Sequence, residues 1–146
     1  MAISRGAGTE IIRSASFEQV ESTAQTLIQG VQHHIYTVLS IIFFNTGGTD
    51  NGTLQLIGYY SYAGTTAQEF NLVNVECAAG STFVWNDKFS FNGYEPTDFT
   101  GAMNAADDQD AIADQGSSVA QYLKFFSTSN STGWDIHITY IDQNNA

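Results

Sequence analysis

The chain has 146 residues and a mass of 15.9 kDa, which corresponds to one domain, long enough to bury a core without disulfides or a metal. Its 4 basic and 15 acidic residues give a formal net charge of −11. This balance argues against partners such as nucleic acid or anionic membranes, because phosphate groups are bound through Lys and Arg. The content of 42% hydrophobic and 13% aromatic residues indicates a folded domain.

The N-terminal residues 1–9 are small and polar, and we interpret them as an arm that precedes a single domain over residues 10–146. They lack the apolar run of a signal peptide, and no segment of the chain is apolar for long enough to span a bilayer. Cys77 has no second cysteine to pair with. We expect it to be a buried thiol, because a reactive thiol needs positively charged neighbours.

The strongest strand signal runs from Val31 to Phe44, after a shorter strand expected at residues 10–14. Apolar residues dominate both of its faces, so we expect it to be covered on both sides, with a second subunit as one cover. One face carries Ile35, Thr37, Leu39, Ile41 and Phe43, and the other carries Tyr36, Val38, Ser40, Ile42 and Phe44.

The middle of the chain alternates between strands and turns. Residues 45–52 predict a loop or hairpin turn, since Asn-Gly readily adopts the positive φ angles of such turns. Strands are expected over residues 53–62 and 68–77. In the second of these the apolar residues change parity after Leu72, and this change predicts a β-bulge near that residue.

Residues 95–114 contain six acidic side chains and no basic one, which predicts a long surface loop. The acidic spacing lacks the internal glycine and the final glutamate of an EF-hand loop. A looser calcium loop and a simple solvated loop both stay open. The acidic residues are Glu95, Asp98, Asp107, Asp108, Asp110 and Asp114.

The last predicted strand alternates cleanly, and it follows another strand over residues 119–127. Trp134, Ile136, Ile138 and Tyr140 are expected to face inward, with Asp135, His137 and Thr139 facing outward. A succession of short strands separated by turn residues is typical of all-β domains. We therefore predict an all-β fold, an antiparallel sandwich of jelly-roll type with an N-terminal arm and one long acidic loop.

No catalytic motif accompanies these strands. The chain has neither the G-x-S-x-G elbow nor the H-E-x-x-H pattern, and His33 and His34 are adjacent, so a regular strand points them to opposite faces. We expect a non-enzymatic protein without a metal or cofactor. A glycan-binding module stays open as a minor alternative. Candidates for exposed recognition are Tyr59, Tyr60, Tyr62, Asp107, Asp108 and Asp110.

Two stretches of the sequence resemble a known pattern. They are AGSTFVWNDKFSF at residues 79–91 and WDIHITYIDQ at residues 134–143. A glycine-serine turn, a strand, a tight turn at an Asp-Lys pair, a second strand and a C-terminal Tyr-Ile-Asp-Gln are similar to small β-sandwich virion proteins of tailed bacteriophages. The strand at residues 34–44 and the stretch at residues 3–13 fit this pattern, whereas the acidic loop departs from it.

The resemblance implies a structural protein of the phage particle, assembled in the bacterial host cytoplasm. We expect a capsid decoration, or cement, protein that forms a homo-oligomer such as a trimer and stabilises the shell by binding the major capsid protein. The alternative is a tail, neck or baseplate protein with a structural or receptor-binding role. Candidate subunit contacts are Ile3, Arg5, Ile11, Ile12, Arg13, Tyr36, Val38, Ile42 and Phe44.

Overall fold

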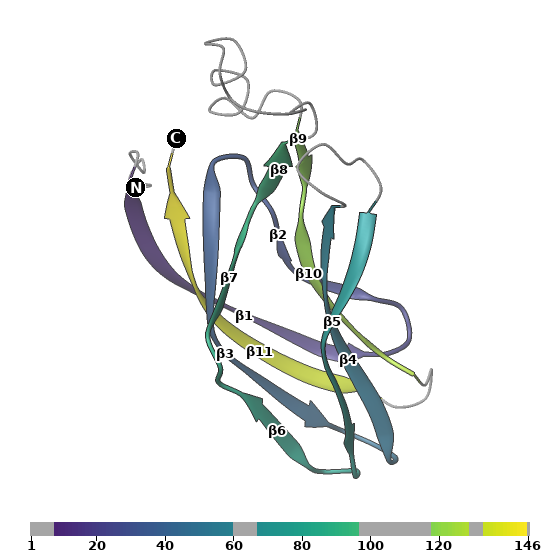
Figure 1. Ribbon diagram of the computed structural model, residues 1–146. Helices are drawn as coiled ribbons and strands as arrows, with labels where there is room; N and C mark the ends of the chain where they lie inside the picture. The colour runs from purple at the N-terminus through teal and green to yellow at the C-terminus, as the bar shows by residue number, and fades with distance from the viewer. Residues whose placement is uncertain (1–7, 60–66, 97–117, 129–132, 146) are drawn as a thin grey trace, which may run out of the picture.

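The computed structural model describes residues 8–59, 67–96, 118–128 and 133–145, and these form an antiparallel β-sandwich (Figure 1). The predicted all-β sandwich is confirmed, and no helix lies within those four ranges. The strands are β1 (Thr9–Val20), β2 (Gln25–Gln29), β3 (His34–Asn45), β4 (Asp50–Tyr59), β5 (Ala67–Cys77), β6 (Thr82–Trp85), β7 (Phe89–Asn92), β8 (Tyr94–Pro96), β9 (Ser118–Ala120), β10 (Tyr122–Ser127) and β11 (Trp134–Asn144).

Two sheets form the layers of the sandwich. The first has the order β1-β11-β3-β6, with β7 also paired to β3, and the second has the order β2-β10-β4-β5. Strands β8 and β9 form a small separate ribbon. Successive strands repeatedly change sheet, from β1 to β2, from β2 to β3, from β3 to β4, from β5 to β6 and from β10 to β11. This alternation is the jelly-roll arrangement expected from the sequence.

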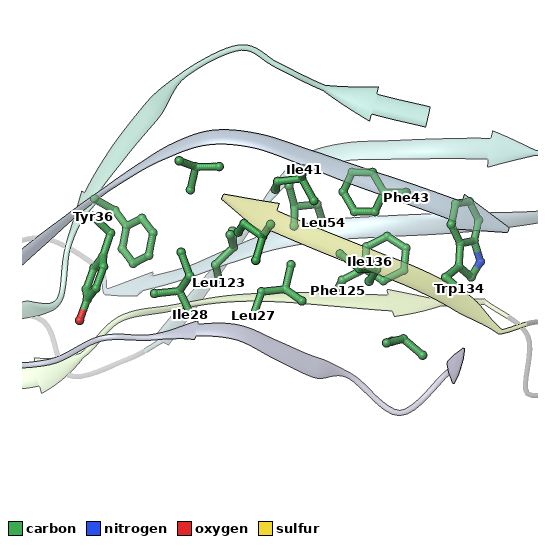
Figure 2. Packing of buried hydrophobic residues seen from close by; sticks show 14 of the residues in the cluster. Leu27, Ile28, Tyr36, Ile41, Phe43, Leu54, Leu123, Phe125, Trp134 and Ile136 are labelled. Carbon is green, nitrogen blue, oxygen red and sulfur yellow. The ribbon is translucent and has the colours of Figure 1, made fainter. Parts of the chain in front are cut away.

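The core lies between the two sheets and is rich in aromatic rings (Figure 2). Phe43 from the first sheet stacks on Phe125 from the second with ring centroids 5.0 Å apart. Trp134 meets Phe125 edge-on at 5.5 Å. Gly52 lies directly beneath the Phe125 ring, where a Cβ would collide with it. The loop expected at residues 45–52 is shorter than predicted, because Asn45 belongs to β3 and residues 50–52 belong to β4.

The inward residues of the last strand were predicted correctly. Trp134, Ile136 and Ile138 are buried, and Tyr140 is half-buried against the same core, whereas His137 is exposed. The predicted bulge in β5 is also confirmed. Leu54 pairs with Val73 and Gln55 with Asn71, which leaves Leu72 as the extra residue.

Strand β3 corrects the prediction of which residues share each of its two faces. Val38 pairs with Tyr140 and Ser40 with Thr139, so Leu39 is an extra residue that forms a β-bulge. Beyond the bulge the inward parity changes, because one added residue turns the rest of the strand over. The buried residues are Tyr36, Val38, Ile41 and Phe43, and the outward ones are Ile35, Thr37, Ser40, Ile42 and Phe44.

Buried polar side chains fix the junction between β3 and β4. The Asn45 amide nitrogen donates to the carbonyls of Gly48 and Cys77, both at 2.7 Å. At the start of β4 the Asp50 carboxylate accepts hydrogen bonds from the hydroxyls of Ser127 and Thr128. Burial raises the pKa of Asp50, but these hydrogen bonds stabilise the charged form more strongly and the net effect lowers the pKa.

The lowered pKa of Asp50 predicts a specific loss of stability in acid. A group whose folded-state pKa is depressed contributes stability above its unfolded pKa, near 3.8, and loses it as the pH falls through the lower folded value. We expect the unfolding free energy of the wild type to exceed that of Asp50→Asn at pH 7. The difference should shrink below pH 3.8, as measured by urea denaturation at a series of pH values. A constant difference would contradict the assignment.

Candidate assembly surface

The outer face of the first sheet carries exposed apolar side chains from two neighbouring strands. Ile42 and Phe44 lie on β3 beyond the Leu39 bulge, and Val84 on β6 pairs directly with Ile42. Their exposed fractions are 39% for Ile42, 37% for Phe44 and 51% for Val84. We call these three residues the outer stripe. An apolar cluster of this kind on a folded domain is typical of a contact surface.

A shallow groove of about 260 Å³ runs beside the outer stripe, across β1, β11 and β3. His137 pairs with Ile42 on one side and with Ser16 on the other, so these residues form one row across the three strands. The Ser16 hydroxyl and His137 Nδ1 are 2.7 Å apart. The groove is lined by Ser16, Phe17, Glu18, Ile42, Phe44, Asp135, Ile136 and His137.

The charge around the groove is negative. Glu18 and Asp135 line it, and Asp135 Oδ1 also accepts a hydrogen bond of 3.1 Å from the Gln19 backbone nitrogen. Gln19 adopts a positive φ of 53° where β1 slips in register between Phe17 and Val20. The face therefore combines apolar side chains with carboxylates, which suits a partner surface that is apolar with basic residues at its margin.

Three side chains, Arg13, His34 and Asp142, link three strands of the first sheet at the opposite end from the outer stripe, and we call them the ionic cluster. Asp142 on β11 accepts a 2.9 Å hydrogen bond from Arg13 Nε on β1 and lies 2.6 Å from His34 Nδ1 on β3. The Asp142 side chain is almost fully buried, whereas Arg13 is half-exposed.

Burial, followed by the charge of Asp142, raises the pKa of Tyr36 to about 12, so this phenol stays neutral.

The structure reassigns several of the predicted subunit contacts. Tyr36 and Val38 are buried inside the sandwich, so they cannot face another subunit, because the Leu39 bulge gives them the inward parity. Arg13 is held by Asp142 of its own chain. Ile42 and Phe44 do lie exposed on the outer face, and Ile12 on β1 is 71% exposed. Ile11, also on β1, is half-buried.

Other predicted residues lie outside the described ranges or at their margins. Tyr59 ends β4, and its side chain is not described. The remaining arm and recognition residues fall outside the described residues, namely Ile3, Arg5, Tyr60, Tyr62, Asp107, Asp108 and Asp110. The outer stripe gained one residue that sequence reasoning missed. Val84 lies between Phe83 and Trp85, whose shared inward face already implied an outward Val84.

The described residues also bear on metal and thiol chemistry. Within the part of the chain that the structure describes, no group of three His, Cys, Asp or Glu side chains is placed to hold a metal ion. Cys77 is buried as expected, and burial raises the pKa of its thiol. No helix in the described ranges is long and apolar enough to cross a membrane.

Comparison with known proteins assigns the chain to no family. No protein-family model matches the chain, and no curated protein matches it. The chain is similar to a protein of Bacillus endospore appendages, described as disulfide-linked pili, at 13% identity and a TM-score of 0.44, over 100% of this chain and 97% of that one.

The chain is also similar to part of a second solved structure. The Clostridium thermocellum N-terminal endo-1,4-β-D-xylanase 10B, with CBM22-1 and GH10 modules in complex with xylohexaose, matches at 10% identity and a TM-score of 0.44. The match covers 91% of this chain and 26% of that one. Because a sandwich supports many unrelated functions, function has to be argued from the surface of this chain.

The ionic cluster generates a stability prediction. Asp142→Asn removes the carboxylate that pairs with Arg13 and contacts His34 Nδ1, so we expect the unfolding free energy to fall by about 2 kcal/mol. The loss is smaller than for a fully buried pair because Arg13 is half-exposed. Chemical denaturation at pH 7 measures the change. Asp87→Asn, at an exposed position, is the matched control and should leave stability unchanged. Equal effects of the two variants would contradict a structural role for the cluster.

Proposed function

We propose that the protein is a non-enzymatic structural subunit of a tailed-phage virion and that it acts there as a capsid decoration protein. The observation that carries the proposal is the outer stripe, in which Ile42, Phe44 and Val84 are exposed side by side on a regular sheet. The resemblance of residues 79–91 and 134–143 to phage virion proteins supports the choice of particle.

The proposed mechanism is stabilisation of the shell by mass action. A protein that binds the assembled shell, and not its free subunits, shifts the equilibrium toward the assembled state. The outer stripe supplies the apolar contact, and the carboxylates of Glu18 and Asp135 select a shell surface with basic residues. The net charge of −11 keeps free copies soluble before assembly.

The alternative position in the particle is the tail, neck or baseplate. A protein there would use the same stripe against a different neighbour, so the two positions differ in which particle part it binds. Co-sedimentation of the purified protein with undecorated capsids, and separately with tail-only particles of the same phage, distinguishes them. Saturable binding to capsids at a fixed ratio to the major shell protein supports decoration, and binding to tails alone supports the alternative.

A matched pair of variants tests the outer stripe itself. Val84→Glu places a charge in the stripe, whereas Val31→Glu makes the same change at a residue that is 48% exposed in the β2–β3 turn. We expect Val84→Glu to weaken capsid binding by at least about tenfold, because an apolar contact is lost and a carboxylate is desolvated. Val31→Glu should bind like the wild type. Equal binding by both variants would remove the outer stripe from the contact.

A further inference from the structure

Strand β1 forms one edge of the first sheet. Among the described residues it pairs with β11 alone, so no other described strand pairs with the outer side of β1 from Glu10 to Phe17 (Figure 1). Its pairing with β11 is regular over nine consecutive residues, from Thr9 to Phe17. An edge that is long and regular is a ready template for another strand.

Several of the usual protections of an edge strand are missing from this segment. Proteins discourage edge pairing with charged side chains, above all lysines, and with prolines and bulges. Strand β1 has the charged residues Glu10, Arg13 and Glu18, but it contains neither Lys nor Pro and is bulged only past Phe17. The other edges differ, since β2 has five residues and pairs with a register shift, β5 is bulged at Leu72, and β6 and β7 divide the remaining edge. Ile12 adds an apolar side chain that is 71% exposed on the outer face of the β1 edge.

We propose that two copies of this chain pair antiparallel through their β1 strands, with Ile12 of each copy facing Ile12 of the other across a two-fold axis. The two first sheets would then form one continuous sheet. This inference rests on the proposed assembling function and names the surface through which copies meet. Its occupant is a second copy because the sequence of β1 is complementary to itself in one register.

The register follows from symmetry and charge. A two-fold axis perpendicular to the sheet keeps each residue on its own face, so one residue must oppose its own copy. Centring on Glu10 or Arg13 sets like charges directly opposite, and centring on Ser14 sets Glu10 opposite Glu18. Like charges directly opposite are destabilising, so these three registers are disfavoured.

Registers centred on Thr9, Ser16 or Phe17 lie at the ends of the regular segment and pair few of its residues. The other registers, centred between Glu10 and Ala15, differ in which residue lies opposite Ile12. Centring on Ile11 sets Ile12 opposite Glu10, and centring on Ala15 sets it opposite Glu18. Centring on Ile12 sets the two exposed isoleucines against each other, Ile11 opposite Arg13, and Glu10 opposite Ser14. This register has no like-charge pair and covers the apolar side chain. The charges elsewhere on the two chains are screened over roughly 8 Å at physiological ionic strength.

A cysteine pair tests the register. In an antiparallel ladder directly opposed Cα atoms lie about 4.5–5.5 Å apart, within the range that a disulfide spans. Ile12→Cys should therefore form a disulfide-linked dimer on mild oxidation, as seen on a non-reducing gel. Ser14→Cys is the matched control, because its two copies would be four residues apart along the strands, about 13 Å, and should stay uncrosslinked. Both variants keep Cys77, which is buried.

The mass in solution tests the pairing without new cysteines. We expect analytical ultracentrifugation to give the wild type a mass twice the 15.9 kDa of the chain, with dissociation on dilution. Ile12→Glu sets two carboxylates opposite each other across the axis, so this variant should sediment as a monomer, and its circular dichroism spectrum should show that it is folded. Val31→Glu should remain a dimer. Crosslinking through Ser14 and not Ile12, or a wild-type monomer or trimer at every concentration, would overturn the proposal.

The outcome is separable from that of the proposed function. If the wild type is monomeric and Ile12→Glu binds capsids as the wild type does, the β1 pairing is contradicted and the proposed decoration function is not. A dimer that crosslinks through Ile12→Cys but binds no phage particle would support the pairing and contradict decoration. The two experiments read different surfaces, the β1 edge and the outer stripe.

Discussion

The β-bulge at Leu39 is the constraint on which the rest of the surface depends. Side chains alternate strictly along a strand, so one extra residue in β3 reverses the faces of everything beyond it. Before the bulge Tyr36 and Val38 enter the core, and after it Ile41 and Phe43 do so. A strand that is apolar on both faces can in this way contribute even-numbered residues to the core before the bulge and odd-numbered residues after it. What is left over on the outside, Ile42 and Phe44, then becomes a surface that another molecule can cover.

Polar contacts hold the sandwich together at both of its ends and leave the described outer face of the first sheet free of such contacts between its apolar side chains. At one end Asp142 ties Arg13 on β1 to His34 on β3, and at the other Asn45 and Asp50 hold the β3–β4 junction. These contacts join strands far apart in the sequence, so they fix how the sheet is assembled. Between them the outer face has few internal partners for its apolar side chains. A sheet whose strands are held in place and whose outer face is partly apolar is preorganised for binding, because little has to rearrange on contact.

Strand β1 connects the two proposed contacts. Arg13 is hydrogen-bonded to Asp142. Because side chains alternate along a strand, the neighbouring Ile12 lies on the opposite face, where it is exposed. The same strand contributes Ser16, Phe17 and Glu18 to the groove beside the outer stripe. A pairing at the β1 edge would therefore bring two grooves and two outer stripes onto one continuous sheet face. Two weak contacts held on one rigid body bind a repeating surface more tightly than either does alone.

The sequence by itself determined the fold class, the Leu72 bulge and the inward face of β11, because each follows from local alternation of apolar residues. It also placed Ile42 and Phe44 on one face. Only the tertiary structure decided that Tyr36 and Val38, which share their parity, lie inside. The bulge at Leu39 exists through pairing with β11, which is distant in sequence, and no local pattern in β3 reports it. The partners of Arg13, His34 and Asp50 could not be predicted either. Asp142 approaches Arg13 and His34, and Ser127 and Thr128 approach Asp50, only when the sheets are assembled.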